Sequence, residues 1–444
     1  MRDRRDRMDG IHQGRQAMGQ QGQKIAVIGA GISGLASAYF LARKHDVVLF
    51  ETGSYAGGHT NTVDITLEGK TFPVDTGFLV FNEATYPNLI ALLDELAVPS
   101  YATDMSFGVS LDDGRFEWAG TNLDTVFAQR RRMMSPSFLC MLKDILRFNR
   151  AAQANLKASL SRPTTLGELL AAGGYGAMFR DAYLLPMAAA IWSSSPADIL
   201  QFPASTFLRF CLNHGLLQIG NRPQWRTVQG GAREYVRKIL VTLPAVRLNT
   251  RVQQVFKRSK TICVRTENGE EDYDAVVFAT HAPQTLRVLA DATAEERRLL
   301  SAARYQANVA YLHTDLDLMP RQRKVWSSWN YLGGASVGGQ RSVCVSYWLN
   351  RLQVLPCRTD VMVTLNPDKP PKDASVIASF DYEHPVFDQA AISAQQALGA
   401  IQGKRGIWFA GAWTGYGFHE DGLKSALRVA ADFDVAPPWA RAAP

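Results

Sequence analysis

The chain has 444 residues, of which 46% are hydrophobic and 20% charged, so it can bury a large core and has the balance of an ordinary soluble enzyme. Its net charge is +7, but no nucleic-acid-reading motif accompanies the basic residues, which argues against a nucleic-acid partner. The five cysteines have no paired spacing, which argues against a zinc site or a disulfide framework and is typical of reduced cytoplasmic thiols.

The first 22 residues are basic and contain no apolar run. A secretory signal peptide needs such a run, so we expect a disordered basic arm instead. No later stretch reaches the roughly 18 consecutive apolar residues of a membrane-spanning helix. The sequence therefore predicts a cytoplasmic protein and leaves peripheral contact with the inner face of the membrane as an open alternative.

Residues 24–51 have the pattern of a nucleotide-binding unit. Two short apolar runs, residues 24–28 and 47–50, are typical of buried parallel strands. A helix is expected between them over residues 35–44, and Glu51 follows the second strand. Strand, glycine-rich turn, helix, strand and acid in this order predict dinucleotide binding.

The turn between the first strand and the helix carries three glycines with separate roles. Gly29 permits the tight turn, Gly31 lets the backbone approach a pyrophosphate, and Gly34 lets helix and strand pack closely. Free N–H groups at the helix N-terminus suit the phosphates. Glu51 can accept hydrogen bonds from a ribose diol and would repel a 2′-phosphate.

Later glycine motifs carry a resemblance to the flavin-containing amine oxidoreductase superfamily, which includes monoamine oxidases, protoporphyrinogen oxidase and phytoene-type desaturases. The matching pieces are Gly29-x-Gly31-x-x-Gly34, Glu51, Gly57-Gly58, Asp75-x-Gly77, Val228-Gln229-Gly230-Gly231, Ala275-Val276-Val277-Phe278-Ala279-Thr280, Phe409-Ala410-Gly411 and Glu420-Asp421-Gly422. The resemblance implies an α/β fold in which a Rossmann-type FAD-binding domain is interleaved with an α+β substrate domain. It also implies non-covalent FAD, since no cysteine lies beyond Cys357.

The resemblance places the FAD-binding residues on these motifs. They are Gly29, Gly31, Ile32, Ser33, Gly34, Glu51, Thr52, Gly57, Gly58, His59, Thr76, Gly77, Phe78, Val252, Ala279, Thr280, Gly411, Ala412, Glu420, Asp421 and Gly422. We expect the FAD-binding domain to comprise residues 23–85, 215–285 and 405–436, and the substrate domain residues 86–214 and 286–404, with a tail over residues 437–444.

Periodicity predicts the remaining elements in chain order. Helices are expected over residues 89–96, 122–130, 136–156, 166–172 and 175–190, from residue 232, over residues 389–399, and from about residue 421. Strands are expected over residues 251–256, 275–278, 309–313, 324–329, 342–348 and 361–364.

Two neighbouring residues are candidates for the chemistry. By resemblance, His419 stands where monoamine oxidases place one tyrosine of a substrate-facing pair, so it could act as a base or shape the pocket. Glu420 could serve the flavin or a helix terminus. Aromatic residues expected to line an apolar pocket, or else to be ordinary core, are Trp192, Trp329, Tyr347, Trp348, Trp413 and Tyr416.

Residues 130–150 have the composition of a basic amphipathic helix beside an arginine triplet. Phe138, Met141, Leu142, Ile145 and Phe148 form one apolar row, while Lys143, Arg147 and Arg150 share another face. Such a helix can bind an anionic membrane, or it can pack on the core like any surface helix. The sequence leaves both interpretations open.

Three motifs resemble a bacterial branch of the superfamily associated with cyclopropane and furan fatty acid metabolism. They are Trp326-x-x-Trp329-Asn330-Tyr331, Val363-Thr364-Leu365-Asn366-Pro367 and Gly415-Tyr416-Gly417-Phe418-His419-Glu420-Asp421-Gly422. The resemblance implies desaturation of an unsaturated fatty-acyl chain, free or on a phospholipid, by hydride transfer to flavin N5. Oxygen or an unidentified acceptor would take the electrons. The alternatives are an FAD-dependent amine or amino-acid oxidase, and a non-redox flavin isomerase or lipid carrier.

Overall fold

The computed structural model describes residues 22–192, 194–218, 220, 222–334 and 343–440. The predicted basic arm, apart from Gly22, and the last four residues of the predicted tail lie outside this part of the chain. The expected division into two domains stays a prediction. Among the described helices, none combines the length and hydropathy that a membrane crossing requires.

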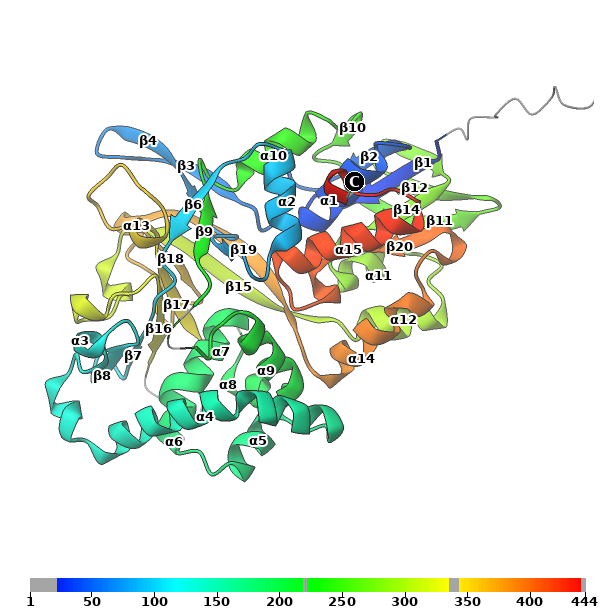
Figure 1. Cartoon of the computed structure of the whole chain (residues 1–444). Helices are drawn as coiled ribbons and strands as arrows, with labels where there is room; N and C mark the ends of the chain where they lie inside the picture. Colours follow the sequence, from blue (N-terminus) through cyan, green and yellow to red (C-terminus); the bar gives the residue numbers. More distant parts are fainter. Residues whose placement is uncertain (1–21, 193, 219, 221, 335–342, 441–444) are drawn as a thin grey trace, which may run out of the picture.

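A five-stranded parallel sheet occupies one end of the molecule, at the upper right of Figure 1. Its order is β10-β2-β1-β14-β20, and all neighbouring pairs are parallel. The strands are β1 (Lys24–Ile28), β2 (Asp46–Phe50), β10 (Ala245–Arg247), β14 (Ala275–Phe278) and β20 (Ile407–Phe409). The two strands predicted for the nucleotide-binding unit are therefore confirmed and lie side by side.

The two faces of this sheet bury alternate residues, as a strand period of two requires. Ile25 and Val27 pack with helices on one face, whereas Ala26 and Ile28 pack against the other layer. The first layer contains α1 (Ile32–Leu41), α2 (Pro87–Glu95), α10 (Arg233–Leu240) and α15 (His419–Asp432). The second contains the meander β11 (Val252–Arg258), β12 (Thr261–Thr266) and β13 (Gly269–Tyr273), with α11 (Ala282–Val288), α12 (Ala294–Ser301) and α14 (Gln389–Ala397).

A seven-stranded mixed sheet forms the second half of the molecule, in the order β19-β15-β18-β17-β16-β7-β8. Only the β16–β7 pair is parallel. The strands are β7 (Phe107–Leu111), β8 (Phe116–Ala119), β15 (Arg304–His313), β16 (Trp329–Gly333), β17 (Cys344–Trp348), β18 (Met362–Leu365) and β19 (Val376–Val386). Near it lie the short helix α13 (Leu349–Leu352) and two small sheets. One sheet pairs β3 (Thr62–Leu67) with β4 (Lys70–Asp75). The other contains β5 (Phe81–Asn82), β9 (Trp225–Val228) and β6 (Ser100–Thr103) in this order.

A group of helices packs with the seven-stranded sheet and appears in green and teal in the lower part of Figure 1. They are α4 (Pro136–Ser161), α5 (Leu166–Ala172), α6 (Ala177–Phe179), α7 (Leu185–Trp192), α8 (Pro196–Gln201) and α9 (Ala204–Asn213). Side chains of the helices and of the sheet share one large hydrophobic core. This core also forms one side of a large cavity between the two sheets.

Several predicted elements differ from the structure. Residues 122–130 form only the short helix α3 (Leu123–Val126), followed by a 3-10 helix at Arg130–Met134, and residues 175–190 divide into α6, a π-helical turn and α7. Lys324 lies in a 3-10 turn rather than a strand, because β16 begins at Trp329. Strands β6 to β8 were not predicted. Neither was β19, an edge strand that contains Pro385, a residue tolerated at an edge because no ladder donor is needed there.

Candidate active site

A cavity of about 800 Å³ is lined by residues of both large sheets. This volume is near the upper end for ligand-binding cavities. One side of it is formed at the carboxyl ends of β1, β2, β14 and β20, where Gly29, Glu51, Ala279 and Gly411 line the space. Parallel sheets bind ligands at this edge, so the fold positions a binding site here.

The glycine-rich turn after β1 forms the base of the cavity. Gly29 has a φ of +100°, and a Cβ on Gly34 would lie 1.8 Å from the carbonyl oxygen of Gly29. These two positions therefore require glycine for packing. A Cβ on Gly31 would meet no protein atom within 4 Å, and Gly31 lines the cavity. The space in front of Gly31 is thus open to a ligand.

The N-terminus of α1 and the carboxylate of Glu51 complete the base of the cavity. Helix α1 begins at Ile32 without a side-chain cap, so its first N–H groups are free to bind an anion. Glu51 accepts hydrogen bonds from the N–H groups of Ala30 and Gly53, both at 2.8 Å, and these fix the carboxylate beside the turn. We call residues 28–34 together with Glu51, Gly57 and Gly58 the cradle.

The second glycine pair, Gly57-Gly58, packs directly against the first motif. The N–H of Gly57 donates to the carbonyl of Ala30 at 2.7 Å. A Cβ on Gly58 would approach the Cα of Gly31 to 3.2 Å, and Gly58 has a φ of +58°. The close approach of these two backbones explains why glycine recurs here.

Helix α15 borders the cavity, because its N-terminal turn crosses α1. A Cβ on Gly422 would lie 2.7 Å from the Ile32 side chain, so this glycine permits the crossing. The loop before α15 brings residues 411–413 and 416–419 to the cavity. The helix begins at His419, slightly earlier than predicted.

Most of the predicted FAD-binding residues line the cavity. They are Gly29, Gly31, Ile32, Ser33, Glu51, Thr52, Gly57, Gly58, His59, Thr76, Gly77, Phe78, Val252, Ala279, Thr280, Gly411 and Ala412. Gly34, Glu420, Asp421 and Gly422 do not line it. Gly34 and Gly422 act from behind the lining as packing glycines.

Of the two roles expected for Glu420, at the flavin or at a helix terminus, the structure shows the second. Its buried carboxylate accepts hydrogen bonds from the N–H groups of Asn88, at 3.3 Å, and Leu89, at 3.0 Å, so it binds the N-terminus of α2. The neighbouring Asp421 accepts the N–H of Phe418, and burial raises the pKa of its carboxyl to about 6. Both acids therefore organise helix termini outside the cavity.

His419 lines the cavity but has its imidazole fixed. Its Nε2 lies 2.8 Å from Thr60 Oγ1 and 3.2 Å from the Tyr235 hydroxyl, and its ring stacks on Phe78 with centroids 3.6 Å apart. Burial lowers the pKa of His419 to about 3, so the ring is neutral at physiological pH. The arrangement suits a residue that shapes the pocket, and it weakens the imidazole as a base.

Three histidines meet in the cavity wall, and sequence reasoning recognised His59 but missed His281 and His384. The ring centroid of His59 lies 5.3 Å from that of His384 and 6.5 Å from that of His281, and Nδ1 of His281 lies 2.9 Å from the Glu383 carboxylate. Burial lowers the pKa of His384 to about 4. Only His59 belongs to a recognisable motif. His281 immediately precedes α11 and His384 lies on β19, so their contact depends on the tertiary structure.

The opposite side of the cavity is apolar and belongs to the large hydrophobic core. We call this side the apolar wall. It comprises Leu79, Val80, Met105, Ile191, Trp192, Phe210, Leu216, Trp225, Trp329, Tyr347, Leu365, Tyr382, Phe387, Tyr416 and Phe418. Trp413 also lines the cavity but packs with the core behind the parallel sheet. Five of the six predicted lining aromatics therefore reach the cavity.

Trp348 is the exception. Although Tyr347 and Trp348 are adjacent on β17, successive strand residues point to opposite faces. Tyr347 packs edge-on against Trp329 at 5.0 Å in the cavity wall. Trp348 instead packs edge-on against Trp326, and its indole N–H donates to Asp360 at 3.0 Å.

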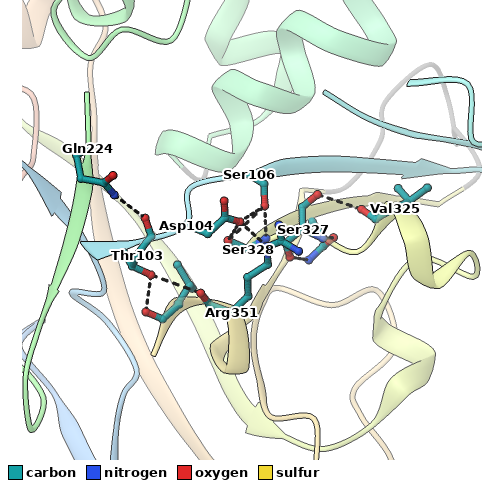
Figure 2. Close-up of polar contacts among 10 residues, drawn as sticks. Thr103, Asp104, Ser106, Gln224, Val325, Ser327, Ser328 and Arg351 are labelled. Carbon is teal, nitrogen blue, oxygen red and sulfur yellow. Dashed lines mark hydrogen bonds and ion pairs between the residues drawn. The ribbon is translucent and has the colours of Figure 1, made fainter. Parts of the chain in front are cut away.

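A polar cluster behind the wall holds two of its residues in place (Figure 2). The carboxylate of Asp104 accepts hydrogen bonds from the hydroxyls of Ser106 and Ser328 and from the guanidinium of Arg351. Burial alone would raise the pKa of Asp104, but these donors lower it below its usual value.

The cluster joins the two segments that present wall residues. Met105 lies between Asp104 and Ser106, and Trp329 follows Ser328 and donates its backbone N–H to the Ser106 carbonyl at 3.0 Å. Both Met105 and Trp329 line the cavity. The polar residues of Figure 2 are therefore bonded to one another, and their effect on the cavity is to position these two side chains.

The residues present fit a flavin dinucleotide. The open space at Gly31 and the free N-terminus of α1 suit a pyrophosphate, and Glu51 suits a ribose. The apolar wall then faces the remaining space, where a ring system and a substrate can meet without water. None of the five cysteines, all of which are described, lines the cavity.

Residues 32–326 match the family model described as flavin containing amine oxidoreductase, which is more than half of the chain. No curated protein matches the sequence significantly.

Solved structures with the same fold cover 93% of this chain. One is a CLA-producing fatty acid isomerase from P. acnes, with 14% identity, a TM-score of 0.65 and 99% of its chain covered. A putrescine oxidase bound to putrescine has 16% identity, a TM-score of 0.65 and 99% covered. A cyclohexylamine oxidase from Brevibacterium oxydans IH-35A has 16% identity, a TM-score of 0.63 and 100% covered. At these identities the likeness shows the fold alone.

Proposed function

Because this chain belongs to the flavin containing amine oxidoreductase family, and is thus an FAD-dependent enzyme, we propose that its substrate is an unsaturated fatty-acyl chain, which it dehydrogenates. The observation that carries this proposal is the chemistry of the apolar wall. Bound FAD supplies the hydride acceptor.

The apolar wall contains no charged residue. Among the described residues, the carboxylates and guanidiniums that line the cavity are those of Glu51, Arg251, Arg287 and Glu383, and none belongs to the hydrophobic core that supplies the wall. A buried ammonium group is unstable without a charged or hydrogen-bonding partner, whereas an acyl chain gains free energy from every methylene that it buries, about 0.8 kcal/mol each. The wall therefore favours a hydrocarbon substrate over a cation.

The absence of lysine among the lining residues points in the same direction. In the amine-oxidising members that the sequence resembles, a lysine is expected near flavin N5, and the corresponding strand of this chain offers Asn308. The structure shows Asn308 buried on β15, where its side-chain amide binds the carbonyl of Gln306 and the amide of Asn366. It does not line the cavity.

The residues of the chain would hold the acyl chain and exclude water. Trp329 and Tyr347 pack edge-on and form a rigid section of the wall, and the Asp104 cluster fixes the backbone beneath them. His419, held by Thr60 and Tyr235, keeps a neutral imidazole beside Phe78. In the proposal its part is to shape the pocket, and proton removal by His419 stays a prediction.

Two other functions are each favoured by a separate observation. The aromatic wall could hold an amine through cation–π contacts, which supports an amine oxidase. The fatty acid isomerase among the structural neighbours supports a non-redox reaction on the same kind of acyl substrate. The amine oxidase would leave the buried cation without a charged partner in the wall, and the isomerase rests on a likeness of fold alone.

Anaerobic mixing separates the three functions. The oxidised holoenzyme is mixed with unsaturated fatty acid, with unsaturated phospholipid, or with an amine panel, while flavin absorbance and product mass are followed. We expect an unsaturated acyl substrate to bleach the flavin and to lose two hydrogens. Bleaching by amines alone would overturn the proposal in favour of an amine oxidase. A shifted double bond at unchanged mass, without net bleaching, would favour an isomerase.

A further inference from the structure

The sequence alone left open whether the apolar row of α4 packs on the core or binds a membrane. Phe138, Met141 and Phe148, from the apolar row that the sequence offered to a membrane, are fully buried in the core. Arg147 is also engaged, because its guanidinium binds Asp144 and the carbonyl of Gly173. For these residues the interpretation as an ordinary core-packing helix is the right one.

The opposite side of α4 presents a second row, of which the sequence pattern revealed only the cations Lys143 and Arg150. Its residues are spaced four and three apart, which places them along one face of the helix. We call this row the α4 stripe, and its exposed members are Leu139, Lys143, Leu146, Arg150, Gln153, Lys157 and Leu160.

The α4 stripe alternates exposed leucines with cations. Leu139, Leu146 and Leu160 are 44%, 40% and 53% exposed. Lys143 and Arg150 lie between them, and neither forms an ion pair within the described part of the chain. The one acid of α4, Asp144, is bound to Arg147 off the stripe.

More exposed apolar side chains precede the stripe in the chain. Met133 and Met134 of the 3-10 helix before α4 are 52% and 89% exposed, and Leu123 of α3 is 77% exposed. Arg131, next to them, is exposed as well. In Figure 1, α3 lies near the end of the molecule at which α4 begins.

From this pattern we propose that the α4 stripe and the three apolar side chains before it dock on an anionic lipid bilayer. Exposed leucines interleaved with cations, without acids, match the chemistry of a bilayer surface, which offers hydrocarbon beneath negative headgroups. A second copy of the chain is a poor occupant, because two stripes would bring cations against cations. The proposal does not depend on the identity of the substrate.

Vesicle co-sedimentation with the full-length holoenzyme tests the proposal. The probes are vesicles of phosphatidylcholine alone and vesicles with 30% phosphatidylglycerol. We expect binding to the anionic vesicles only, weakened when salt rises from 50 to 500 mM because the charges are screened. K143E/R150E should weaken binding by at least about 30-fold, since each basic residue near the surface contributes about fivefold. L139Q/L146Q should weaken it at both salt concentrations.

Matched controls separate the stripe from net charge and from general surface hydrophobicity. K260E/K369E makes the same change in net charge at two exposed lysines elsewhere. V241Q/V354Q removes two valines that are 84% and 82% exposed. Both controls should bind like the wild type, and flavin content should be unchanged in every variant.

Two results would overturn the proposal. One is failure of the wild type to bind anionic vesicles. This includes the case in which the stripe forms a dimer interface instead, and K143E/R150E dissociates the dimer. The other is an equal loss in the stripe variants and their controls, or no loss in either. All variants retain the basic residues 1–22, so binding through that segment alone would leave the stripe variants unaffected and would count against the stripe.

Discussion

The cradle and the apolar wall line the same cavity, but the chain assembles them in different ways. The cradle comes mainly from residues 28–34 and 51–58, and it acts through backbone groups and glycines that permit close approach. The wall comes from two helices, α7 and α9, from strands β9, β16, β17, β18 and β19, and from several loops, and it acts through bulky side chains. The cradle tolerates little change in its residues, because its backbone segments are in close contact. The wall can be altered one side-chain contact at a time.

The largest effect is expected when a packing glycine of the cradle gains a Cβ. In Gly34→Ala the new Cβ would lie 1.8 Å from the Gly29 carbonyl oxygen, so backbone must move. We expect a loss of roughly 3 kcal/mol or more in the free energy of unfolding, or no soluble protein. Thermal denaturation and flavin absorbance measure both effects. A stable yellow G34A protein would contradict the assigned packing role.

Gly31→Ala should separate binding from folding. Gly31 has a φ of −72°, and its Cβ would meet no protein atom, so the apoprotein should keep its stability. The methyl group would fill space reserved for the cofactor, and we expect FAD affinity to fall roughly 10- to 100-fold, about 1.4–2.7 kcal/mol. Equilibrium dialysis of the apoprotein measures this. Unchanged affinity would place the pyrophosphate elsewhere.

Substitutions of Trp329 and Trp348 test which aromatic residues belong to the apolar wall. Trp329→Phe should raise KM for the acyl substrate about fivefold with little change in stability, because the indole N–H has no hydrogen-bond partner among the described residues. Trp348→Phe should leave KM unchanged but lower stability by about 1–2 kcal/mol, since it loses the bond to Asp360. The reverse pattern would show that the wall is wrongly assigned.

The histidines between cradle and wall should give a smaller, pH-dependent effect. His384 has a pKa of about 4 in the folded protein because it is buried, below the unfolded value of about 6.5. The folded state therefore binds fewer protons, and this stability is present above pH 6.5 and is lost as pH falls toward 4. The melting temperature, measured from pH 8 to pH 4, should fall less steeply for His384→Asn.

Other buried histidines set the background for that measurement. Burial also lowers the pKa of His214 to about 4 and of His419 to about 3. The wild-type slope below pH 6.5 therefore contains several protons, and His384→Asn should remove about one. An identical slope in both proteins would show that His384 does not titrate in this range.

The local motifs were predictable because their residues are adjacent in the sequence. Gly29, Gly31 and Gly34 with Glu51 predicted the strand–turn–helix–strand unit, and the structure confirms it. The Gly57-Gly58 pair stood out in the sequence as a cofactor motif, and the structure shows it packed against the glycine-rich turn. Each inference rests on a backbone constraint that acts over a few residues, and such constraints are visible in a single sequence.

Predictions about individual side chains were less accurate. Tyr347 and Trp348 looked equivalent, yet strand alternation sends them to opposite faces. Glu420 stands in a cofactor motif, but its carboxylate binds the terminus of a helix more than 300 residues earlier in the chain. The apolar row of α4 was visible, but which side of the helix the core would cover depended on the elements packed against it.

The sequence by itself determined the cofactor-binding unit, the family and the aromatic residues available for an apolar pocket. These depend on local spacing and residue type. Only the tertiary structure decided which aromatic residues form the wall, which acids serve helix termini, how His59, His281 and His384 meet, and which side of α4 faces solvent. The physical reason is that these contacts join residues tens to hundreds of positions apart. Their choice is made by the packing of whole elements, and no single stretch of sequence contains that information.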